Sequence, residues 1–84
     1  MILSAEVATT LGRLRLTFEP EVEDGQPVAV GRIAEARLRA ASVASVDSRI
    51  ASVGLWEWPP VDERWAADLI AREGLQAAIL EAGE

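Results

Sequence analysis

The chain contains no cysteine and no histidine, and lysine, asparagine and tyrosine are missing as well. Without cysteine there is no disulfide framework and no thiolate metal site. Without histidine or lysine, a serine nucleophile lacks its usual activating bases. Glycines are scattered and show no phosphate-binding spacing. We therefore expect a protein that is not an enzyme and that binds no metal and no cofactor.

Carboxylates are the remaining route to acid–base chemistry. Glu57 with Asp62 or Glu63 is the only pair of acids near several aromatic residues. Two acids beside an indole can act on a sugar. In a chain of 84 residues, however, surface acids and a helix cap are the favoured interpretation.

Long apolar runs are also missing, and the N-terminus has no basic segment followed by an apolar one. The sequence thus predicts no membrane span and no secretory signal, and we expect a cytoplasmic protein. The net charge of −6 should repel nucleic acid and anionic membranes. One small domain over residues 1–84 is expected, and its small core favours a homo-oligomer.

The clearest local signals are helical and lie near the C-terminus. Asp62 can accept a backbone N–H at a helix start, and Gly74 suits the position just past a helix end. The spacing of apolar residues between them predicts a helix over 62–73. A shift in the phase of that spacing predicts a second short helix over 75–82.

Alternating residues predict strands in the first half of the chain. Leu14, Leu16 and Phe18 alternate with polar residues, which is typical of a half-buried strand. Asp24-Gly25 favours a hairpin turn. The predicted fold is α+β, with a small antiparallel sheet whose strands lie near 2–9, 13–19, 27–31 and 49–58.

Residues 32–44 fit two structures. Over 34–40 apolar and polar residues alternate, which indicates a strand. The same residues are strong helix formers, and Glu35 and Arg39 make a favourable pair four residues apart. The helix is narrowly favoured, and the strand stays open.

Three tryptophans are the best candidates for function. Trp65 lies on the apolar side of the predicted helix 62–73 and should be buried. Trp56 should lie deeper than Trp58, because the prolines after Trp58 end the predicted strand 49–58 there. The candidate partner-binding residues are Trp56, Glu57, Trp58, Pro59 and Pro60.

Basic residues concentrate at Arg32, Arg37, Arg39 and Arg49. A solvated surface is favoured over a patch for an acidic partner or a phosphate. The leading hypothesis is a non-enzymatic protein-interaction module with a tryptophan-containing apolar surface and an acidic rim. It resembles small phage or accessory regulators and inhibitors in size and charge only. The alternatives are a structural subunit of a homo-oligomer and a sugar- or peptide-binding module that uses Trp56 and Trp58.

Overall fold

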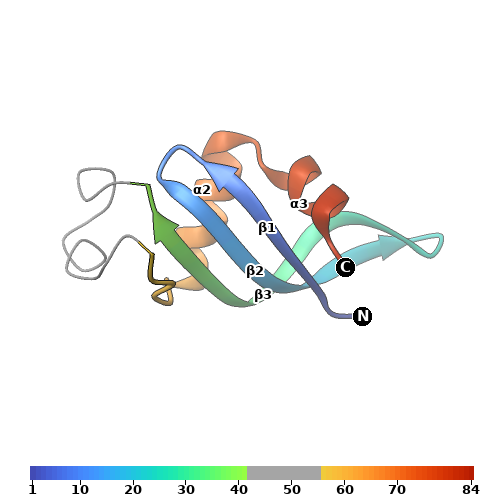
Figure 1. The fold of residues 1–84 in the computed structure, drawn as a ribbon. Coiled ribbons are helices and arrows are strands. Elements are labelled where there is room, and N and C mark those ends of the chain that lie inside the picture. The colour runs from blue at the N-terminus through green and yellow to red at the C-terminus, as the bar shows by residue number, and fades with distance from the viewer. Residues whose placement is uncertain (42–55) are drawn as a thin grey trace.

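The chain folds as a three-stranded antiparallel sheet followed by two helices (Figure 1). This computed structural model describes residues 1–41 and 56–84. The strands pair in the order β1-β2-β3, and both helices pack against the same face of the sheet. The elements are β1 (Leu3–Thr9), β2 (Gly12–Glu23), β3 (Gln26–Ala40), α2 (Glu63–Glu73) and α3 (Gln76–Ala82). The predicted α+β fold is confirmed.

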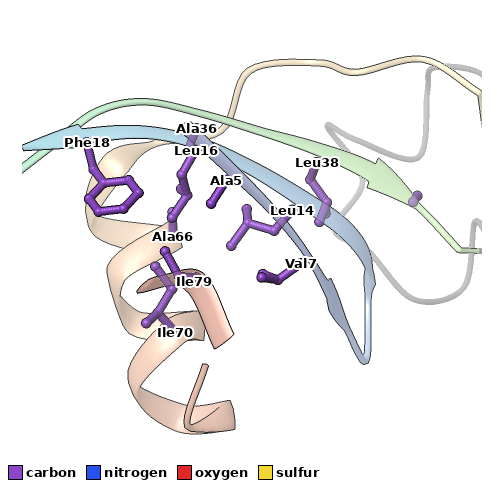
Figure 2. Close-up of a cluster of buried hydrophobic side chains, with 11 residues drawn as sticks. Ala5, Val7, Leu14, Leu16, Phe18, Ala36, Leu38, Ala66, Ile70 and Ile79 are labelled. Atoms are coloured by element: carbon purple, nitrogen blue, oxygen red, sulfur yellow. The ribbon is translucent and has the colours of Figure 1, made fainter. Parts of the chain in front are cut away.

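The core lies between the sheet and the helices (Figure 2). Leu14, Leu16 and Phe18 point from β2 to this inner face and are almost completely buried. Ile70 from α2 and Ile79 from α3 close over them. Strict alternation along β2 thus places its large apolar side chains inside and its polar ones on the outer face.

The helix predicted over 32–44 is wrong, because residues 32–40 continue β3. Residues 42–44 lie outside the described residues. These residues adopt the strand indicated by their alternating pattern, and not a helix, because β3 pairs with β2. The pairing places Leu38 opposite Leu14 and Ala36 opposite Leu16 on the buried face. The predicted strand 27–31 is the first part of this longer strand.

The β2–β3 hairpin extends well beyond β1. Its turn is formed by Asp24 and Gly25, which both have positive φ angles of 51° and 78°. This is the two-residue turn that the sequence predicts. Further along, a Cβ added to Gly31 would lie 2.3 Å from the Glu19 carbonyl oxygen, so only glycine fits where the hairpin bends.

The two C-terminal helices confirm the predictions for 62–73 and 75–82. Asp62 caps α2, its Oδ1 accepting the backbone N–H groups of Arg64 and Trp65 at 2.8 and 3.2 Å. Gly74 ends the helix in the left-handed conformation, with φ 63°. No helix among the described residues is both long and apolar enough to span a membrane.

The predicted strand 49–58 lies largely outside the described residues, which resume at Trp56. Residues 56–58 form no strand. Just after them the chain runs briefly beside the edge of β3: the Leu38 N–H donates to the Pro59 carbonyl, and the Val61 N–H donates to the Ala36 carbonyl. This contact holds the segment before α2 against the sheet.

Candidate functional site

The outer face of the sheet, opposite the helices, carries a block of four arginines. Arg13 and Arg15 project from β2, and in the antiparallel register they lie opposite Arg39 and Arg37 of β3, respectively. Like charges placed directly across a ladder destabilise a sheet. The block is therefore not explained by the stability of the sheet itself.

Two glutamates on the same face offset part of this charge. Glu6 of β1 bridges Arg13 and Arg15 at 2.9 and 3.1 Å, and Glu35 contacts Arg37 at 2.6 Å. The side-chain hydrogen bonds from Arg13 and Arg15 hold the pKa of the Glu6 carboxyl below its ordinary value. Four arginines against two glutamates leave the face basic, although the chain as a whole is acidic.

Trp58 lies across this block. The guanidinium carbon of Arg15 is 3.9 Å from the centroid of the Trp58 ring, and that of Arg39 is 5.5 Å away. Both distances are within the range of a cation–π interaction. The Arg37 guanidinium also donates a hydrogen bond of 2.9 Å to the Trp58 carbonyl. Two arginines therefore contact the indole of the half-buried Trp58 on the outer face of the sheet, and a third holds its backbone carbonyl.

Trp56 is the most exposed large apolar side chain described, with 77% of its surface accessible. The prediction that it lies deeper than Trp58 is wrong. The reason is that residues 56–58 are not in a strand, so the rule that alternate residues share one covered face does not apply. Glu57 is also exposed, and Pro60 pairs with Arg37 as an isolated bridge.

We define the Trp–Arg face as Trp58 and the four arginines of this surface, together with the exposed tryptophan two residues before Trp58 in the chain: Trp56, Trp58, Arg13, Arg15, Arg37 and Arg39. Of the predicted partner-binding residues, Trp56 and Trp58 are part of this face, and Glu57, Pro59 and Pro60 adjoin them in the chain. The four arginines make this face basic, whereas the sequence predicted acidic residues around the tryptophans. Trp65 belongs elsewhere, since it is half-buried and packs against the core.

Sequence reasoning found Arg37 and Arg39 but left out Arg13 and Arg15. The sequence did contain a signal for them. Arg13 and Arg15 are two residues apart, as are Arg37 and Arg39, so in a strand each pair projects from one face. What was missing was the pairing of the two strands, since residues 32–44 were assigned to a helix. Arg32 lies nearer the hairpin and bonds Glu19 at 3.0 Å, and Arg49 lies outside the described residues.

Two acids outside the Trp–Arg face have defined hydrogen-bond partners. The Asp62 carboxylate is occupied by the N-terminal amides of α2, as the cap interpretation predicted. Glu73 accepts two hydrogen bonds from Thr10, which lower the pKa of its carboxyl and tie the β1–β2 turn to α2. Residues 1–41 and 56–84 contain no cluster of three metal-ligating side chains.

A shallow groove lies between β3 and the helices. Its lining has no charged side chain, and the Gln76 Oε1 accepts the Val30 N–H at 3.4 Å within it. It therefore offers little chemistry compared with the Trp–Arg face. Its lining residues are Val30, Gly31, Ile33, Ala67, Ile70, Ala71, Gly74 and Gln76.

Comparisons of this chain with protein families, with curated proteins and with solved structures find no match.

Proposed function

We propose that this protein is a non-enzymatic interaction module that binds another protein through the Trp–Arg face. The observation that carries the proposal is the stacking of Arg15 on Trp58 at 3.9 Å, two residues along the chain from Trp56, which is 77% exposed. Tryptophan and arginine are the residue types most enriched where binding energy concentrates at protein interfaces. A tryptophan held by guanidinium groups, with a more exposed tryptophan two residues before it in the chain, suits such a contact.

The destabilising effect of the arginine pairs on the sheet supports the same proposal. Two arginine pairs face each other across β2 and β3, an arrangement that weakens a ladder. A partner that supplies carboxylates would relieve this repulsion and use all four guanidinium groups. The partner surface is therefore acidic, and the indoles of Trp56 and Trp58 provide the apolar contact.

Protein is a better partner than nucleic acid for this surface. The chain carries fourteen acids against eight arginines, so its overall field repels a polyanion. Glu6 and Glu35 also occupy part of the hydrogen-bonding capacity of the arginines. Titration with a single-stranded oligonucleotide should leave the tryptophan fluorescence unchanged.

The proposal is tested by affinity capture from the source cell, with tagged protein as bait and mass spectrometry as readout. Wild-type bait should capture a specific acidic protein or further copies of this chain. Trp56→Ala should lose this capture, whereas Arg72→Ala on the far side of α2 should retain it. Equal capture by wild-type and Trp56→Ala baits would contradict the proposal.

A further inference from the structure

The charges of this chain are segregated along its length. Beyond Phe18, which pairs with Leu3 at the end of the β1–β2 ladder, β2 and β3 continue alone as a two-stranded ribbon (Figure 1). We call residues 19–32 the acidic arm. It carries four acids and one arginine: Glu19, Glu21, Glu23, Asp24 and Arg32.

The charge of the acidic arm is largely uncompensated. Arg32 bonds Glu19 at 3.0 Å, and no other ion pair forms on the arm among the described residues. Val22 and Val28 are 46% and 45% exposed on the same ribbon. The arm thus presents carboxylates and apolar side chains together, while the Trp–Arg face presents guanidinium groups and indoles together.

The tip of the acidic arm and the Trp–Arg face lie toward opposite ends of the β2–β3 ladder, which pairs Arg13 with Arg39 near one end and Glu23 with Gln26 at the other, in an elongated molecule whose axes measure 43 × 19 × 19 Å. In Figure 1 the hairpin turn projects at one end, and the segment that begins at Trp56 lies near the other. An arm stiffened by its ladder cannot fold back across this distance to its own face. Only the arm of another copy can reach it.

We propose that the acidic arm of one copy docks on the Trp–Arg face of a second copy. The inference rests on the proposed function, because it uses the same face and names its occupant. Carboxylates of the arm approach Arg39 and its neighbours, and the exposed valines cover Trp56. Two copies lying antiparallel satisfy both contacts at once, so a symmetric dimer is the smallest closed assembly.

Charge exchange between two variants tests this contact. Glu23→Arg reverses a charge on the acidic arm, and Arg39→Glu reverses one on the Trp–Arg face; both side chains are exposed. Matched controls make the same changes in net charge elsewhere: Glu81→Arg on α3 and Arg64→Glu on α2. Sedimentation velocity at low salt measures the association of each protein and of the two variants mixed.

Wild type should self-associate, and added salt should weaken the association because exposed charges are screened. Each arm or face variant should weaken it about tenfold or more, with unchanged circular dichroism, whereas both controls should associate as wild type does. An equimolar mixture of Glu23→Arg and Arg39→Glu should recover association. A wild type that stays monomeric, controls as disruptive as the variants, or a mixture without recovery would each overturn the inference.

The outcomes of this experiment and of affinity capture together distinguish a failure of the dimer proposal from a failure of the proposed function. If wild type is monomeric but captures an acidic protein in a Trp56-dependent way, the face is an interaction surface and its occupant is a different chain. If neither occurs, both proposals fail.

Discussion

The interaction between Arg15 and Trp58 can be measured directly as a coupling free energy. The guanidinium lies 3.9 Å from the ring centroid, but half of the Arg15 side chain is exposed to water. Cation–π pairs at exposed sites contribute about 0.5–1 kcal/mol, and more only when they are desolvated. We expect the lower range here.

A double-mutant cycle isolates this energy. Arg15→Met removes the charge and keeps an aliphatic chain, and Trp58→Leu removes the ring and keeps an apolar side chain. The contact of Arg15 with Glu6 is lost in both limbs of the cycle, so it cancels. Urea unfolding of the four proteins should give a coupling of about 0.5–1 kcal/mol.

The same cycle between Trp58 and Arg72, which lies on α2 and bonds Asp68, should give no coupling. A coupling between Arg15 and Trp58 that is equally small would refute the reasoning. The indole would then rest on the sheet without being held by its arginines.

Three further predictions concern the fold. Asp62→Ala should cost about 0.5–2 kcal/mol in urea unfolding, because it removes the cap of α2. Gly31→Ala should lower the melting temperature more than Gly83→Ala, since its new Cβ would lie 2.3 Å from the Glu19 carbonyl oxygen, whereas at Gly83 the nearest atoms are 3.4 Å away. The folded state lowers the pKa of Glu6, so its stabilising contribution is complete above pH 4.5 and is lost as the pH falls further. Glu6→Gln should therefore flatten the dependence of stability on pH below 4.5, which chemical unfolding at several pH values would measure.

Local signals in the sequence were enough for half of the fold. The alternation of Leu14, Leu16 and Phe18, the Asp24-Gly25 turn and the Asp62 cap each depend on neighbouring residues alone, and the structure has all of them. Residues 32–40 could not be decided in this way. Their strand structure depends on pairing with β2, which brings Leu38 against Leu14 from a distant part of the chain.

The site was half predicted for the same reason. The tryptophans and prolines pointed to residues 56–60, and among these Trp58 contacts Arg15 and Arg39 in the structure. Its charge, however, comes from Arg13 and Arg15 meeting Arg39 and Arg37 across two strands, a register that no single segment contains. Trp56 was predicted to be more buried than Trp58 because both were assigned to a strand over 49–58, and residues 56–58 form no strand.

The indole N–H signals of the three tryptophans test the central claim most directly. In a nitrogen-edited NMR titration at low salt, the nitrogen-labelled protein is titrated with a binding partner. The partner is either unlabelled copies of the same protein or the acidic protein identified by capture. Binding at the Trp–Arg face should shift or broaden the signals of Trp56 and Trp58 and leave that of Trp65, which packs against the core, unchanged. Unchanged signals from Trp56 and Trp58 at saturating partner, or a change confined to Trp65, would contradict the account.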